Sequence, residues 1–203
     1  NIRAGCSMAD MADLPDVEAC WNELLANSNL LDPATREDAE LPAESGSSYL
    51  VPVTYMNSSA DLKAFVGHHG GIVCTSSNAA GVLEWALERA GENGKVLFFP
   101  DQHLGRNTAL AMGYNNDDLA VWNPMMEPDW QSLNAAKFVL WHGYCSVHQR
   151  FTVEQINDLR DAHPGALIIA HPECDRTVVD AADASGSTEM IRRYVEEAPS
   201  GSV

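Results

Sequence analysis

The stretch GIVCTSSNAAGVLEWALERAGENGKVLFF, residues 71–99, decides the fold, because it reads as strand, helix and strand in succession. Its two apolar ends predict short strands at 71–74 and 95–99. The apolar side chains between them fall on one face of a helix over 77–90: Val82, Leu83, Ala86 and Leu87. A strand–helix–strand unit favours parallel strands in one sheet, so this stretch predicts the α/β class.

The same alternation continues on both sides of this stretch. Short apolar runs predict further strands at 49–55, 119–122, 138–141 and 166–170, and polar–apolar periodicity predicts helices at 152–162 and 188–197. The strands are almost entirely apolar, as expected for a sheet that is covered on both faces. We therefore predict repeated three-layer α/β units with short, mainly parallel sheets.

Two segments interrupt this pattern. Residues 27–48 are polar and rich in Pro and Ser, which predicts an insertion or a surface loop. Residues 114–134 contain Asn115, Asn116, Pro124 and Pro128 between apolar runs, and we expect them to separate two units, 1–130 and 131–203. The chain begins with Asn rather than Met and ends without a stop-like feature, so we interpret it as an internal segment of a longer protein.

Composition limits the possible functions. The 203 residues include 12 Lys and Arg against 29 Asp and Glu, a net charge of −17 that would repel phosphates and disfavours nucleic acid as a partner. No apolar run approaches the roughly 20 residues of a membrane helix, and we expect no membrane partner. The five Cys are odd in number and widely spaced, which favours a reducing cytosol over a disulfide framework. The absence of a CxxC pair excludes a self-contained zinc ribbon.

Polar residues follow five of the predicted strands, where ligands bind in open parallel sheets. These residues include Asn57, Ser76, Asp101, Cys145, His148, His171 and Glu173. One interpretation is that Ser, Thr, Asn and Asp here only cap helices. The other is a binding site, in which the helix starts near Ser76 and at 186–188 offer amides to a phosphate or a carboxylate.

Cysteine, histidine and glutamate supply the reactive groups. Cys6 follows a Gly at the mouth of a helix and Cys145 follows a strand, so either could be a metal ligand or a nucleophile. His171 and Glu173, separated by one Pro, could orient a substrate and move protons. The alternative for this pair is a surface imidazole and a solvated carboxylate. Cys20 and Cys74 fit core positions.

Seven motifs in order give the sequence a specific resemblance. They are GCSMAD (5–10), VTYMNSSADLKA (53–64), CTSSNA (74–79), LFFPDQHLGR (97–106), WHGYCSVHQRF (141–151), HPEC (171–174) and DAADASGST (180–188). Together they resemble the quinolinate synthases, iron–sulfur enzymes of de novo NAD biosynthesis.

The resemblance implies three similar α/β domains in a pseudo-three-fold arrangement around a central site. It implies a 4Fe–4S cluster held by three Cys, with one open iron that acts as a Lewis acid. The reaction implied is the condensation of iminoaspartate with dihydroxyacetone phosphate to quinolinate, phosphate and water. An aspartate-oxidising enzyme is the implied partner, and the cytoplasm is the implied location.

The resemblance also assigns roles to residues. Cys6 and Cys145 match two cluster ligands, and the third ligand is expected beyond Val203. Tyr55 and Asn57 match a pair of active-site residues, and Ser76 matches a serine that contacts an anion. His171 matches the active-site imidazole, and Glu173 matches the carboxylate proposed as acid and base. Ser187 and Thr188 match contacts to a substrate carboxylate or phosphate.

Two departures from the family pattern keep a second interpretation open. About 20 extra residues lie between Cys6 and Tyr55 relative to the usual spacing, and the chain holds two of the three ligands. The missing third ligand, together with the helix starts near Ser76 and at 186–188 that could bind anions, motivates the alternative: a non-catalytic α/β module that binds a phosphorylated or dicarboxylate metabolite. A Rossmann-type dinucleotide enzyme is disfavoured, because the sequence lacks GxGxxG between a strand and a helix.

Overall fold

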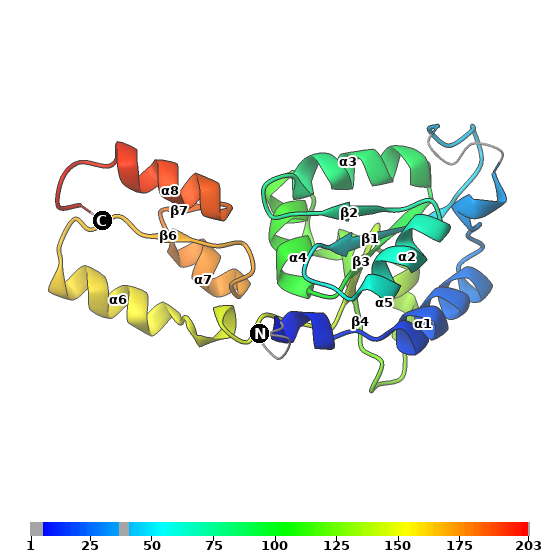
Figure 1. Cartoon of the computed structure of the whole chain (residues 1–203), viewed down its shortest axis with the longest axis horizontal. Helices are drawn as coiled ribbons and strands as arrows, with labels where there is room; N and C mark the ends of the chain where they lie inside the picture. Colours follow the sequence, from blue (N-terminus) through cyan, green and yellow to red (C-terminus); the bar gives the residue numbers. More distant parts are fainter. Residues whose placement is uncertain (1–5, 37–40, 203) are drawn as a thin grey trace.

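The computed structural model describes residues 6–36 and 41–202, and it contains two α/β units side by side (Figure 1). The first unit holds a five-stranded parallel sheet in the order β2-β1-β3-β5-β4. Its strands are β1 Leu50–Tyr55, β2 Ile72–Cys74, β3 Lys95–Phe99, β4 Leu119–Trp122 and β5 Phe138–Trp141. The predicted α/β class is therefore confirmed.

Helices cover both faces of this sheet. One face carries α3 Ala79–Ala90 and α4 Gln102–Ala111, and the other carries α1 Leu14–Asn27, α2 Ala60–His68 and α5 Trp130–Ala135. Alternate residues of β3 belong to the two cores, with Phe98 on the α3 side and Leu97 on the α1 side. Strands β1, β3 and β5 are buried at every residue, and their sequences are accordingly mostly apolar.

The second unit is smaller and is built on a two-stranded parallel sheet, β6 Ile169–Ala170 and β7 Ala184–Ser185. Its helices are α6 Val153–Ala162, α7 Arg176–Ala181 and α8 Thr188–Glu197. The predicted strand over 166–170 is therefore too long. Its first residues bond elsewhere, since the backbone N–H of Leu167 donates to Ser202 O and that of Ile168 to a carboxylate oxygen of Asp183.

The predicted boundary near residue 130 falls inside the five-stranded sheet. Strand β5 lies between β3 and β4 and pairs with both, so residues 131–141 belong to the first unit. The segment 114–134 likewise contains β4 rather than a linker between units. Its polar residues form the turn of one 3-10 helix, Asn116–Asp118, with Asn115 and Asp118 in a capping box. The division between the sheets lies after Trp141.

The polar segment 27–48 crosses the surface of the first unit, apart from residues 37–40, which lie outside the described part. It contains a short 3-10 helix, Pro33–Thr35, and one isolated bridge between Leu31 and Tyr49. Asp32 Oδ2 lies 2.6 Å from Nδ1 of His69 at the end of α2, which ties the segment to the core. None of the described helices has the length and apolar character needed to cross a bilayer.

Candidate active site

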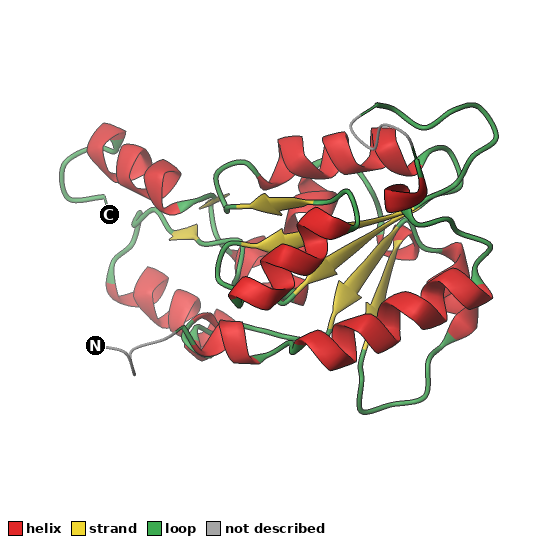
Figure 2. Cartoon of the chain, turned by 45° about the vertical axis from the view of Figure 1, so that its right-hand side comes forward, coloured by secondary structure: helices red, strands yellow, loops and turns green. Residues whose placement is uncertain are grey.

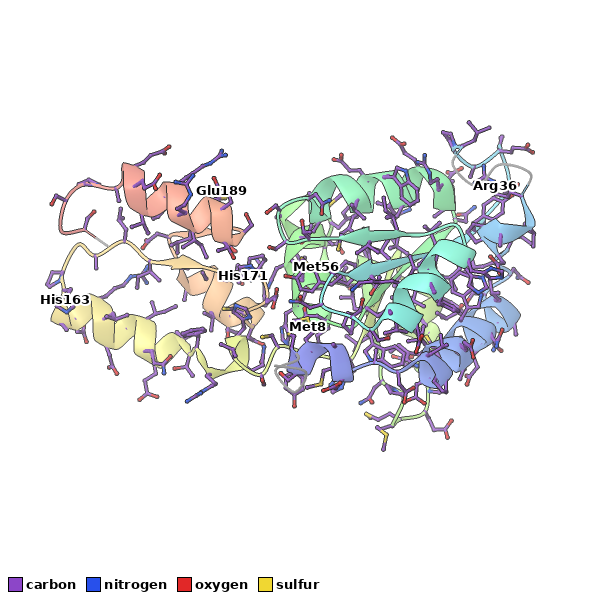
Figure 3. All side chains as sticks on the ribbon, in the orientation of Figure 1. Met8, Arg36, Met56, His163, His171 and Glu189 are labelled. Atoms are coloured by element: carbon purple, nitrogen blue, oxygen red, sulfur yellow. The ribbon has the colours of Figure 1, made fainter. Side chains whose placement is uncertain are left out.

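The carboxyl ends of the parallel strands in the first sheet point toward the second unit (Figure 2). The loops that follow β1, β2 and β5 therefore meet the loop that follows β6. His171 of the second unit lies at this junction, opposite Met8 and Met56 of the first unit (Figure 3). This is the edge at which open parallel sheets bind ligands.

Glu173 is the centre of the junction, with a carboxylate that is almost fully buried. Its Oε2 lies 3.1 Å from Nδ1 of His148, and its Oε1 lies 3.8 Å from Nδ1 of His171. Burial opposes ionisation, but the contacts from His148 and from the Tyr55 hydroxyl outweigh it and lower the pKa of Glu173. Glu173 is therefore a carboxylate at neutral pH and can accept a proton.

His171 is oriented by its own loop. The backbone N–H of Glu173 donates to Nδ1 of His171 over 3.3 Å, and the His171 ring stacks on His148 with centroids 4.8 Å apart. Burial lowers the pKa of His171, although the Glu173 charge opposes this. The neutral ring, which accepts at Nδ1, carries its proton on Nε2, so Nε2–H is a hydrogen-bond donor.

Tyr55 closes the other side of Glu173. Its pKa is raised, first by burial and then by the hydrogen bond and charge of Glu173, so the phenol stays protonated and donates to the carboxylate. Ser76, the predicted anion-contacting serine, also forms a hydrogen bond with the Tyr55 hydroxyl. Tyr55, Ser76, His171 and Glu173 thus form one connected group across the two units.

The two predicted cluster ligands sit on loops that touch. Ser7 Oγ and Ser146 Oγ, each next to one of the cysteines, are 2.7 Å apart. Cys6 is exposed, whereas Cys145 is buried, and burial, Glu173 and Cys6 together raise the pKa of the Cys145 thiol against backbone hydrogen bonds that lower it. Cys145 Sγ, an imidazole nitrogen of His148 and a carboxylate oxygen of Glu173 lie within 4.8 Å of one another, a group that could hold a metal.

Close backbone packing fixes the position of the Cys145 loop. A Cβ added at Gly143 would lie 1.8 Å from the carbonyl oxygen of Pro100 and 3.0 Å from Cβ of Met11. The Gly143 carbonyl accepts from the Gln102 N–H, and the Trp141 indole donates to Met11 O. Only glycine allows these segments to approach, so the sequence WHGYC places Cys145 against the segment that follows Cys6.

Three predicted substrate residues lie apart from Glu173. Asn57 is half-buried beyond β1, and its side chain has no hydrogen-bond partner among the described residues. Ser187 is the N-cap of α8 and accepts from the Met190 N–H, while Thr188 is exposed as the first residue of that helix. Ser187 and Ser76 do line one cavity of about 330 Å³ between the units. The geometry thus joins Ser187 to Ser76 but leaves Asn57 and Thr188 unassigned.

Sequence reasoning gave no role to three residues that the structure brings to the junction: His148, Asp101 and Asn107. The sequence feature that could have identified His148 is its position three residues after Cys145. Asp101 caps α4, and His103 Nδ1 in the first turn of that helix lies 4.0 Å from Asp175 Oδ2 of the second unit.

A second cavity, of about 570 Å³, lies within the second unit. Apolar side chains from α6, β6 and α7 line most of it, and His148, His171 and Cys174 line its edge at the junction. Cys174 itself is buried, and burial raises the pKa of its thiol to about 11. Cys20 and Cys74 are buried in the two cores of the first unit, as predicted.

These features define an α/β protein in which two parallel-sheet units hold a carboxylate, two imidazoles, a phenol and a thiol at their junction. The family described as "Quinolinate synthetase A protein" matches residues 1–203. The chain therefore belongs to that family, and the resemblance seen in the seven motifs is confirmed.

Curated relatives named quinolinate synthase match over essentially the whole chain. The protein from Corynebacterium glutamicum is 55% identical, with 47% of its own length covered. Those from Acidobacterium capsulatum and Bacillus subtilis are 47% and 43% identical, each with 50% of its length covered. The chain spans about half the length of these relatives, and it is a fragment relative to them.

Proposed function

We propose that this chain is part of a quinolinate synthase that condenses iminoaspartate with dihydroxyacetone phosphate to form quinolinate, phosphate and water. The observation that carries the proposal is the buried Glu173 carboxylate, held between Tyr55, His148 and His171 beside the Cys145 thiol. Proton transfers dominate a condensation followed by loss of water, and this group contains a base and two donors.

Each residue has a role that follows from its protonation state. Glu173, as the carboxylate, takes a proton from the condensing substrate and returns it during ring closure. His171 presents Nε2–H to a substrate oxygen, since Nδ1 is occupied by the Glu173 amide. Tyr55 stays protonated and holds the carboxylate in place, and Asn57 supplies an amide at the same edge of the sheet.

The acidic ends of the substrates need donors, and Arg176, which lines the cavity of Ser76 and Ser187, is already paired with Asp180. The cavity lined by Ser76 and Ser187 provides hydroxyls beside the start of α8. Thr188 adds a third hydroxyl at the first turn of that helix. Backbone amides and hydroxyls at a helix start favour phosphate and carboxylate groups, which suits both proposed substrates.

Cys6 and Cys145 offer the thiols that hold iron–sulfur groups, and the loops that carry them touch through Ser7 and Ser146. The residues present therefore fit such a group. When bound, a 4Fe–4S cluster with one open iron supplies a Lewis acid for the loss of water. A third Cys ligand is proposed beyond Val203, in a third α/β domain that completes a pseudo-three-fold arrangement. We further propose a cytoplasmic location and an aspartate-oxidising enzyme as the source of iminoaspartate.

The proton role is tested in a protein that carries this chain at the full length of its relatives. We expect Glu173→Gln to lower kcat by about 100-fold or more, the scale of general acid–base catalysis. Glu154→Gln, an exposed glutamate at the start of α6, is the matched control and should keep full turnover. Unchanged turnover in Glu173→Gln contradicts the role of the carboxylate.

The ligand role is tested separately, by the absorbance of the same protein after reconstitution with iron and sulfide under anaerobic conditions. Cys6→Ser and Cys145→Ser should each lose most of the cluster absorbance, whereas Cys20→Ala, in the core of the first unit, should retain it. Binding of inorganic phosphate or a dicarboxylate without any cluster or turnover would instead favour the alternative, a non-catalytic binding module. The cavity lined by Ser76 and Ser187 is the observation that supports that alternative.

A further inference from the structure

Helix α4 of the first unit reaches the loop of the second unit that carries His171 and Glu173. The contact is made by Asn107, which is 4% exposed. Its Nδ2 donates to the carbonyl oxygen of Pro172 over 2.8 Å and to that of Cys174 over 2.9 Å. The two acceptors flank Glu173, so one amide group fixes the backbone on both sides of the carboxylate-bearing residue.

The orientation of the Asn107 amide is determined by these partners. Both partners are carbonyl oxygens, which only accept, so the NH₂ end must face the loop. Its Oδ1 is consequently turned away and is buried without a hydrogen-bond partner. A buried acceptor without a partner is unfavourable, and a residue that only filled space here would not require it. The arrangement therefore favours a residue selected for its two N–H groups.

The hydrogen bonds within the loop 171–174 do not fix its position relative to the first unit. Within the loop, the Cys174 N–H donates to His171 O and the Glu173 N–H donates to His171 Nδ1, and both bonds move together if the loop moves. Tyr55, which donates to Glu173, belongs to the first unit. The distance from Tyr55 to Glu173 therefore depends on a connection between the first unit and this loop, which Asn107 makes.

We propose that Asn107 is a positioning residue, which holds the loop 171–174 so that Glu173 and His171 face Tyr55 across the junction. The proposal rests on the proposed function for its catalytic consequence. Asn107 also lines the cavity of Ser76 and Ser187, but its amide N–H groups donate to the loop, so it has no donor left for a phosphate or carboxylate. Its effect is on the placement of the acid–base pair, so its loss should lower kcat and leave substrate affinity largely intact.

The test compares Asn107→Asp and Asn107→Leu in a protein that carries this chain at the full length of its relatives. Asp keeps the shape of Asn but has no N–H to donate, and Leu keeps the approximate volume without polar atoms. We expect each to lower kcat by about 10- to 100-fold, the scale of a catalytic group displaced by about 1 Å, with KM changed by less than about threefold. Ala109→Gly, which weakens the same helix at a buried position away from the loop, is the matched control and should keep kcat within about twofold.

A second measurement does not depend on activity. Hydrogen–deuterium exchange of the peptide that contains Glu173 and Cys174 should become at least about tenfold faster in both Asn107 variants and stay unchanged in Ala109→Gly. Unchanged exchange and unchanged kcat in Asn107→Asp overturn the proposal, as does an equal loss of kcat in Ala109→Gly. If the unsubstituted protein forms no quinolinate, the proposed function fails, while the exchange measurement still decides whether Asn107 holds the loop.

Discussion

Replacing Asp101 by Asn should change the pH dependence of stability in the first unit. Asp101 is fully buried at the start of α4, where Oδ1 accepts from the Leu104 N–H over 2.6 Å and Oδ2 has no hydrogen-bond partner. Burial raises the pKa of this carboxyl from 3.8 to about 7, opposed by the Leu104 hydrogen bond and reinforced by the Glu173 charge. The folded protein therefore binds this proton more tightly than the unfolded chain does.

The direction and size of the effect follow from linkage. A raised pKa in the folded state contributes stability that is fully present below pH 3.8, the unfolded value, and is lost as the pH rises through about 7. The difference between a pKa of 3.8 and one of about 7 corresponds to about 4 kcal/mol of unfolding free energy in total. About 2–3 kcal/mol of this stability is lost between about pH 5 and about pH 8. Asn keeps an acceptor for the Leu104 N–H and does not titrate, so Asp101→Asn removes this loss.

The assay is urea unfolding followed by tryptophan fluorescence at a series of pH values. All five Trp, at 21, 85, 122, 130 and 141, lie in the first unit, so the signal reports the unit that contains Asp101. We expect Asp101→Asn to gain about 2–3 kcal/mol over the unsubstituted protein on going from about pH 5 to about pH 8. Parallel stability curves across that range would refute the reasoning, because they would mean that Asp101 does not change its charge there.

Three further changes test the packing of the first unit and the electrostatics of the junction. Gly143→Ala should lower the free energy of unfolding by about 2–4 kcal/mol, because the added Cβ would lie 1.8 Å from the carbonyl oxygen of Pro100. An unchanged urea midpoint would show that the backbone can move apart there at little cost. Phe98→Ala should lower the free energy of unfolding by about 3–5 kcal/mol, since Phe98 is fully buried between β1 and β5, and a loss below about 1 kcal/mol would contradict this packing. Tyr55→Phe should raise the pKa of Glu173, because it removes a hydroxyl that stabilises the carboxylate. NMR titration of the Glu173 carboxyl measures this change, and an unshifted or lowered pKa would exclude the hydrogen bond.

The first unit could be predicted closely because its signals are local. Its strands at 95–99, 119–122 and 138–141 have the predicted bounds, since runs of apolar residues mark their ends. In the second unit only the helix at 188–197, which has a clear N-cap, has the predicted bounds. The position of the unit boundary was wrong because it depends on which strands pair. Asn115, Asn116 and two Pro indicate a turn, but nothing local indicates that the strand after that turn returns to lie beside β3.

The sequence indicates most of the residues of the candidate site, but not how they are arranged in space. Resemblance placed Tyr55, His171 and Glu173 together, and the structure joins them, yet His148 received no role. Its stacking on His171 depends on the angle between two loops that are separated by α6. Asn107 could not be found in the sequence either, because its partners are backbone carbonyls 65 and 67 residues away, and any sequence can supply a carbonyl.

The choice of partners for Glu173 has a chemical consequence. Among the described residues, its ion-pair contacts are with two histidines rather than with Lys or Arg, and its further donor is a phenol. Lys and Arg would hold their protons throughout the physiological range, and a carboxylate paired with them would be a weak base. An imidazole can instead be uncharged, as His171 is when burial lowers its pKa, so Glu173 can gain a proton without leaving a permanent cation unpaired beside it. An acidic chain with few cations thus holds a buried carboxylate without Lys or Arg beside it, which is the arrangement that the proposed proton transfer requires.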